Sequence, residues 1–280
     1  MLLAGCSSNA AEPDASADPA ESKKDFGECE VTENPTVHEF DSTITEGLLT
    51  AAAPLPAPGV FNGDTPESVK SGHGYCLLAE IANRGGLNGV KVIQASWESV
   101  ITAKETNFDV TMLNAIITPE RQEVVDFSTS YQTVNQGVLV REGETYTRDE
   151  LKDLRIGYLI GGEAQKLIEQ EIKPTQEPKV FQKTADMTTA LMANQVDVII
   201  NDVVPIMRWV HQSGDALQVI AQFKDFSGDY GLMLPKDSAN TAIVDQILED
   251  MREDGTLDKI NDYWISTNTG GKVLGDLPVW

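Results

Sequence analysis

Basic residues are scarce in this chain. Its 280 residues include 21 Lys and Arg against 44 Asp and Glu, which gives a formal net charge of −23. Binding to nucleic-acid phosphates needs a basic face, so this balance argues against nucleic acid as a partner. The acidity also weakly favours cationic or zwitterionic ligands over polyanions.

Long hydrophobic runs are absent as well. No stretch of about 18 or more apolar residues occurs, so the sequence predicts no membrane-spanning helix. Apolar residues nevertheless make up 41% of the chain. A chain of this length and composition has room for two domains of ordinary size, each with its own core.

Sequence signatures of catalysis and of metal binding are also missing. His38, His73 and His211 are isolated from one another and from any obvious nucleophile. We find no Cys/His spacing typical of a metal site, no P-loop and no dinucleotide fingerprint. The sequence therefore predicts a protein that is not an enzyme and that holds no metal and no cofactor.

Cysteine is rare, and the three that occur have separate interpretations. Leu3-Ala4-Gly5-Cys6 reads as a lipobox, which predicts cleavage before Cys6 and a lipid anchor on its thiol. Polar residues rich in Ser, Ala, Asp and Glu follow it. We interpret residues 1–40 as a signal remnant, the lipidated cysteine and a disordered tether.

If Cys6 carries lipid, Cys29 and Cys76 remain as a pair. Outside the cytoplasm they can form a disulfide that ties the N-terminal segment to the first domain. The alternative is two free thiols.

The most informative stretch of the sequence is residues 109–128. A β-rich apolar run ends near Thr118, which suits a helix cap, and Pro119 and Arg121 follow in the first turn. This arrangement brings backbone N–H groups and a guanidinium together, and both bind carboxylates well. The alternative is an ordinary capped helix with a surface arginine.

The same stretch resembles the signature of the family 3 extracellular solute-binding proteins, the amino-acid receptors of ABC importers. The matching positions are Thr118, Glu120, Arg121, Val124, Val125, Asp126, Phe127 and Ser128. Further similar segments lie at residues 97–101, 196–202, 230–236 and 254–264, in the order typical of the family.

The resemblance implies an α/β protein with the two-lobed, type II periplasmic-binding-protein fold. Each lobe is expected to be a mostly parallel sheet covered by helices, and two chain crossings form the hinge. We expect lobe 1 at residues 41–140 plus 225–266, lobe 2 at 141–224, and a C-terminal tail at 267–280. A ligand would lie between the lobes and be buried as they close.

Strands and helices are expected to alternate along the chain. Strands are predicted at residues 48–53, 90–95, 108–113, 137–140, 155–160, 180–181, 196–200, 217–221 and 230–234. Helices are predicted at residues 75–83, 98–105, 119–124, 163–171, 184–194, 203–211, 241–251 and 257–264.

Three ligand-binding residues follow from the resemblance. Arg121 corresponds to the clamp on the ligand carboxylate. Asp202 corresponds to the acid that receives the ligand ammonium, although it also fits the N-cap of the helix at 203–211. Trp97 corresponds to an aromatic side chain that flanks the ligand, or alternatively to a core residue.

The chain departs from the family pattern in the first lobe. Ile116 replaces the usual Ser or Thr, so a hydroxyl contact with the carboxylate is lost while the backbone remains. Asn114 replaces a Gly or Ser, and its carbonyl oxygen could accept from an amine. Residues 51–56 lack the acid that many relatives carry there.

The second-lobe wall is also altered. Gly161 and Gly162 permit close backbone approach at a helix start, and Glu163 adds an acid. Phe61 is a candidate for a second aromatic wall. These changes favour a somewhat apolar or amine-bearing amino acid as the ligand.

The resemblance thus implies an extracytoplasmic receptor, attached to the membrane only by its lipid anchor. It would work as a monomer that delivers an amino acid or a related zwitterion to an ABC permease. The alternative is a cyclohexadienyl (prephenate/arogenate) dehydratase-like enzyme on the same fold, with Glu163 as its acid.

Overall fold

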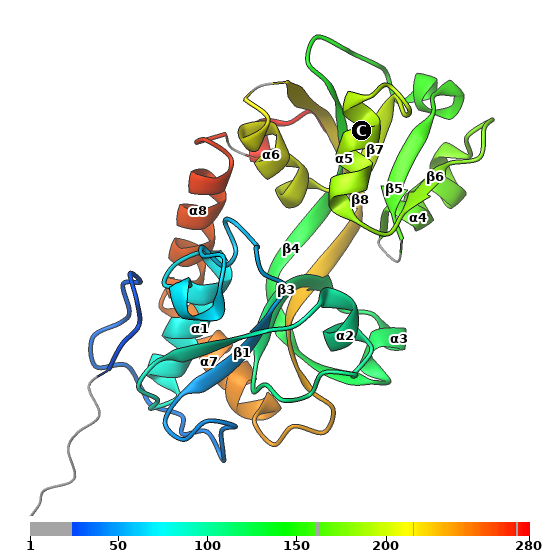
Figure 1. The fold of residues 1–280 in the computed structure, drawn as a ribbon. Helices are drawn as coiled ribbons and strands as arrows, with labels where there is room; N and C mark the ends of the chain where they lie inside the picture. Colours follow the sequence, from blue (N-terminus) through cyan, green and yellow to red (C-terminus); the bar gives the residue numbers. More distant parts are fainter. Residues whose placement is uncertain (1–23, 161–162, 215, 273) are drawn as a thin grey trace, which may run out of the picture.

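Two lobes, connected by two long strands, make up the fold (Figure 1). The structure is a computed structural model that describes residues 24–160, 163–214, 216–272 and 274–280. Strands β4 (Val125–Arg141) and β8 (Leu217–Pro235) pass from one lobe to the other. They pair antiparallel from Val125 opposite Pro235 to Arg141 opposite Leu217, so both crossings belong to one continuous ribbon. The expected two-lobed α/β architecture is confirmed.

Lobe 1 combines a small sheet with several helices. Strands β1 (Leu49–Ala53) and β2 (Val90–Gln94) form this two-stranded sheet, whereas β3 (Thr111–Ile116) pairs with β8 and so belongs to a larger, six-stranded sheet. The helices of lobe 1 are α1 (His73–Arg84), α2 (Trp97–Ile101), α3 (Pro119–Gln122), α7 (Thr241–Glu253) and α8 (Thr256–Asn268), with a short 3₁₀ turn, η1 (Pro66–Ser68).

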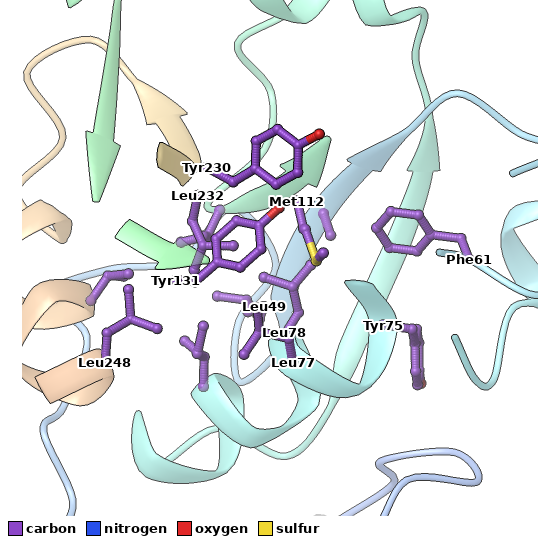
Figure 2. Close-up of a cluster of buried hydrophobic side chains, with 14 of the residues drawn as sticks. Leu49, Phe61, Tyr75, Leu77, Leu78, Met112, Tyr131, Tyr230, Leu232 and Leu248 are labelled. Atoms are coloured by element: carbon purple, nitrogen blue, oxygen red, sulfur yellow. The ribbon is translucent and has the colours of Figure 1, made fainter. Parts of the chain in front are cut away.

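Helical periodicity explains how α7 packs. Val244, Ile247, Leu248 and Met251 are spaced three and four residues apart, and all are fully buried. They join the main lobe 1 core, part of which Figure 2 shows, with Leu49, Leu77 and Leu78 grouped beneath Tyr131 and Tyr230. The predicted helix at 241–251 is therefore confirmed.

Lobe 2 is a sheet with both faces covered. Its elements are β5 (Ile156–Leu159), β6 (Lys179–Phe181), β7 (Val198–Asp202), α4 (Glu163–Leu167), the π-helical turn η3 (Ile168–Ile172), α5 (Thr184–Met192), α6 (Val203–Gln212), and the 3₁₀ turns η2 (Asp149–Asp153) and η4 (Leu274–Asp276). In β7, Val198 and Ile200 join one core cluster while Ile199 joins another. This alternation is what a strand buried on both faces requires.

The sheets are less parallel than expected. The strand pairs β1–β2, β5–β6 and β5–β7 are parallel, whereas β3–β8, β4–β7 and β4–β8 are antiparallel. Every antiparallel pair involves β4 or β8, which run in opposite directions between the lobes and are much longer than the short segments predicted at 137–140, 217–221 and 230–234. Register shifts interrupt their pairing, which obscures the alternation that sequence analysis uses.

Part of the segment that was assigned to the tether makes contacts with lobe 1. Phe26, Cys29 and Phe40 pack against the main lobe 1 core. The backbone N–H of Thr32 donates to Glu80 Oε2 at 2.9 Å. The tether assignment at residues 1–40 is therefore too long at its end, because these side chains are partly buried against the lobe 1 core. Its first part, with Cys6, lies outside the described residues.

The expected disulfide between Cys29 and Cys76 is confirmed. Their Cα atoms are 5.3 Å apart, and 47 positions separate them in sequence. The bond joins the N-terminal segment to α1.

Replacing both cysteines by serine should lower the free energy of unfolding by roughly 3–4 kcal/mol, because the unfolded chain loses a closed loop of this size. Urea unfolding of the double variant Cys29→Ser/Cys76→Ser, with the reduced wild type as control, measures the effect. Equal urea midpoints for the variant and the oxidised wild type would contradict it.

The C-terminal tail makes a further connection between the lobes. Helix α8 packs in lobe 1, yet the backbone of Gln222 in β8 bonds to Pro278 O at 2.8 Å and receives the N–H of Trp280 at 2.9 Å. The Trp280 ring lies edge-on to Phe223, with centroids 5.9 Å apart. The end of the chain is therefore fixed to lobe 2, which sequence analysis left open.

Candidate ligand-binding cleft

A cleft of about 940 Å³ lies between the two lobes. Lobe 1 contributes Leu55, Phe61, Trp97, Asn114, Ile116 and Arg121, among others. Lobe 2 contributes Leu159, Ile160, Lys183, Asn201, Asp202, Arg208 and Trp209, among others, and the connecting strands contribute Gln136 and Tyr230. Its size suits a small molecule enclosed between domains.

Arg121 is positioned by the local structure that the sequence indicated. Thr118 accepts from the backbone N–H of Arg121 at 3.3 Å as the cap of α3. Nη1 of Arg121 donates to the carbonyl oxygen of Ile116 at 2.6 Å, which holds the guanidinium at the end of β3. Burial lowers the pKa of Arg121, while the nearby charges of Asp202 and Glu163 oppose that shift. The guanidinium thus lines the cleft.

Trp97 lies against this guanidinium. The centre of the guanidinium is 5.5 Å from the Trp97 ring centroid, within range of a cation–π contact. Trp97 lines the cleft and is 39% exposed, so it is not a core residue. Phe61 also lines the cleft, but its ring is buried with the lobe 1 core, where Figure 2 shows it among the other core side chains.

Asp202 ends β7 and precedes α6. Its side chain forms no capping bond to the helix, which disfavours the N-cap interpretation. Instead Oδ1 accepts from Nε2 of Gln136 at 2.7 Å, and Oδ2 accepts from the hydroxyl of Tyr230. Burial raises the pKa of Asp202, and these two hydrogen bonds and the charge of Arg121 oppose that shift.

Gln136 and Tyr230 are site residues that sequence analysis missed. Both belong to the long strands and are fully buried. Burial raises the pKa of Tyr230 well above its usual value, so its hydroxyl stays protonated as a donor. Oε1 of Gln136 has no hydrogen-bond partner in the described residues. A buried acceptor without a partner next to a carboxylate is suited to receive an ammonium group.

Asn114 and Ile116 are placed at the cleft in ways the sequence did not indicate. Asn114 has a positive φ of 51°, a conformation that Asn tolerates better than most residues. Its Oδ1 accepts from the hydroxyl of Tyr131 at 3.1 Å, so that carbonyl is engaged within the protein. The side chain of Ile116 is buried, and its carbonyl oxygen serves Arg121.

The expected second-lobe wall is only partly described. Gly161 and Gly162 lie outside the described residues. Glu163 does not line the cleft, and its carboxylate pairs with Lys166 at 2.8 Å. It remains close enough for its charge to raise the pKa of both Arg121 and Asp202.

Arg208 is a second cleft arginine that sequence analysis overlooked. Pro205, Arg208, Trp209 and Gln212 of α6 all line the cleft, at the three- and four-residue spacing of one helix face. That spacing, counted from the acid at Asp202, was the available signal. Burial lowers the pKa of Arg208.

Nothing in the described residues resembles a metal centre, since no group of three or more His, Cys, Asp or Glu could hold an ion there. In the same residues, no helix is long and apolar enough to cross a membrane. The cleft instead offers a guanidinium with a flanking aromatic ring at one place and a hydrogen-bonded carboxylate at another. These are complementary to the two charged ends of a zwitterion.

Comparison with known proteins identifies the family. The bacterial extracellular solute-binding proteins, family 3, match residues 61–267. ABC transporter arginine-binding protein 1 of Escherichia coli (strain K12) is 28% identical over 177 residues, which cover 60% of this chain and 71% of that protein.

Two solved structures share the fold. The arginine-, lysine-, histidine-binding protein ArtJ from Geobacillus stearothermophilus has a TM-score of 0.63 at 23% identity, covering 82% of this chain and 96% of that one. The ancestral amino acid-binding protein AncCDT-1, a precursor of cyclohexadienyl dehydratase, has a TM-score of 0.61 at 22% identity, covering 78% and 95%. Because the family match spans most of its length, the chain belongs to the bacterial extracellular solute-binding proteins, family 3.

Proposed function

We propose that the protein captures an amino acid between its lobes and delivers it to an ABC permease. The observation that carries the proposal is that Arg121 of lobe 1 and Asp202 of lobe 2 line one cleft. The ligand carboxylate would bind the guanidinium of Arg121, with Trp97 alongside. The ligand ammonium would bind Asp202 and Oε1 of Gln136.

A ligand held at both ends would favour the closed state, because it then contacts both lobes at once. The halves that move would be residues 41–140 plus 225–266 and residues 141–224, with residues 26–40 carried by lobe 1. Opening and closing would bend β4 and β8 between them. Outward surfaces of the two lobes would dock on the permease.

The printed names of similar proteins support the ligand class. The Escherichia coli relative is an arginine-binding protein, and ArtJ binds arginine, lysine and histidine. The dehydratase alternative rests on AncCDT-1 and on Glu163 as an acid. Glu163 pairs with Lys166 outside the cleft lining, so we favour binding over catalysis.

Thermal unfolding against a panel of the common amino acids, at millimolar concentrations, tests the proposal. A ligand that binds only the folded state raises its stability by about 2.7 kcal/mol at 100 times its Kd. At least one amino acid should therefore raise the unfolding temperature by several degrees. The absence of a shift with every member would contradict an amino-acid receptor.

We further propose that Cys6 anchors the protein to the outer face of the membrane through a lipid. The lipobox sequence supports this. Mass spectrometry of the protein recovered from membranes should detect acyl groups on a chain that begins at Cys6, and an unmodified cysteine there would contradict the anchor.

A further inference from the structure

The charge of the cleft is opposite in sign to that of the whole chain. Among the described residues, the charged side chains that line it are Arg121, Lys183, Arg208 and Asp202, which amounts to three positive groups and one negative group. The chain itself carries a formal net charge of −23.

A simple zwitterion would use only part of this charge. Its carboxylate would pair with Arg121 and its ammonium with Asp202, which leaves Arg208 and Lys183 facing the same cleft. Lys183 is exposed at the start of α5 and is well hydrated. Arg208, by contrast, is half-buried in the wall formed by α6.

The positive charge of Arg208 is poorly compensated by the surrounding described residues. Within the described residues its guanidinium forms no salt bridge, and the hydrogen bond that it makes there joins Nη1 to Pro58 O at 3.4 Å, which is long for such a bond. A guanidinium has five donors, and keeping even a half-buried charge without an anion has a desolvation cost. Charged groups that burial perturbs in this way cluster at functional sites.

We infer that the ligand is an amino acid whose side chain ends in a second anionic group, and that Arg208 binds that group. This inference rests on the proposed function. Such a ligand has a net charge of −1 and would make the occupied cleft nearly neutral when Lys183 is left to solvent. Its two carboxylates would be fixed by arginines from opposite lobes, Arg121 and Arg208. A cationic amino acid would find Asp202 as the acid among the described lining residues, since Glu163 lies outside the lining and is paired with Lys166.

Isothermal titration calorimetry of the full chain with matched pairs of ligands tests this inference. The panel comprises aspartate, glutamate and 2-aminoadipate, the amides asparagine and glutamine, and arginine and lysine. The three acids cover different distances between the carboxylates. We expect one acid to bind at least about tenfold more tightly than its amide and than either cationic amino acid, because a buried ion pair replaces a neutral hydrogen bond.

The variant Arg208→Gln separates a ligand contact from a structural role. It should weaken binding of the preferred acid by about 30-fold or more and change binding of the matching amide by less than about threefold. Arg252→Gln on α7 is the matched control, since it removes one arginine outside the cleft and should leave both affinities unchanged. Equal losses for acid and amide in Arg208→Gln would show that Arg208 only latches the lobes through Pro58, and would overturn the inference.

The outcomes also separate this inference from the proposed function. Tight binding of a neutral or cationic amino acid in preference to the acids would overturn the inference and leave the receptor function intact. If no amino acid of any charge binds, the receptor proposal fails and the inference fails with it.

Discussion

Arg121→Ala should abolish ligand binding almost completely. We expect the Kd for the preferred amino acid to rise by about three orders of magnitude, which corresponds to about 4 kcal/mol. Truncating one partner of a buried, hydrogen-bonded charge pair costs this much because the other charge is left without compensation. The loss should be as large for every amino acid that binds, since all share the α-carboxylate.

The folded state should survive this change. The interactions of the Arg121 side chain include a hydrogen bond to Ile116 O and a contact with Trp97, and the helix that carries it has only four residues. We therefore expect the free energy of unfolding without ligand to change by less than about 1 kcal/mol. Calorimetry and urea unfolding of the same sample measure both quantities, with Arg252→Ala as the control outside the cleft.

Arg121→Lys refines the test. Lysine keeps the positive charge but lacks the planar fork that engages both carboxylate oxygens. Intermediate affinity is expected, below wild type and above Arg121→Ala. Unchanged binding in Arg121→Ala would remove the clamp from the proposed site, and with it the assignment of the carboxylate end.

The contrast between Arg121 and Arg208 illustrates what the sequence could and could not reveal. Arg121 belongs to a local capping pattern with Thr118 and Pro119, and local patterns are readable from neighbouring residues. Arg208 belongs to a helix whose cleft-facing side is defined by the other lobe. The spacing from Asp202 could have placed it on the cleft face of α6, but its role depends on tertiary contacts such as the one to Pro58, which neighbouring residues do not reveal.

The long strands show the same limit for the fold. The predicted strands located the C-terminal end of β4 and both ends of β8 but missed the rest, including a stretch of β4 that carries the polar residues Gln132, Thr133 and Gln136. Those residues are satisfied by pairing with the partner strand, and by Asp202 in the case of Gln136. A pattern that relies on apolar alternation does not detect a strand of this kind.

Asp202→Asn should separate binding from stability. The neutral amide cannot form an ion pair with the ligand ammonium, so we expect affinity to fall by about two to three orders of magnitude. In the ligand-free protein the change should be neutral or stabilising at pH 7.5. Asn can still accept from Tyr230, and Oε1 of Gln136, which has no partner in the described residues, can accept from the new amide if the Gln136 side chain turns over.

The pH dependence of stability and of ligand affinity distinguishes wild type from Asp202→Asn more sharply. Burial raises the pKa of Asp202 in the folded state above its unfolded value, so the folded state binds a proton more readily. Its burial cost is therefore present at neutral pH and is relieved as the pH falls through the raised pKa. Stability without ligand should thus improve for wild type relative to Asp202→Asn on acidification, while wild-type affinity declines over the same range because the carboxylate is lost.

Urea unfolding and calorimetry between pH 7.5 and the acidic range measure these opposite trends. Asp186→Asn, an exposed acid on α5, is the matched control and should follow wild type in both. A stability loss of several kcal/mol in Asp202→Asn at neutral pH would instead mean that the carboxylate serves the fold, through Tyr230 and Gln136. The ammonium site would then have to be sought elsewhere in the cleft, because a residue kept for binding is expected to cost stability rather than supply it.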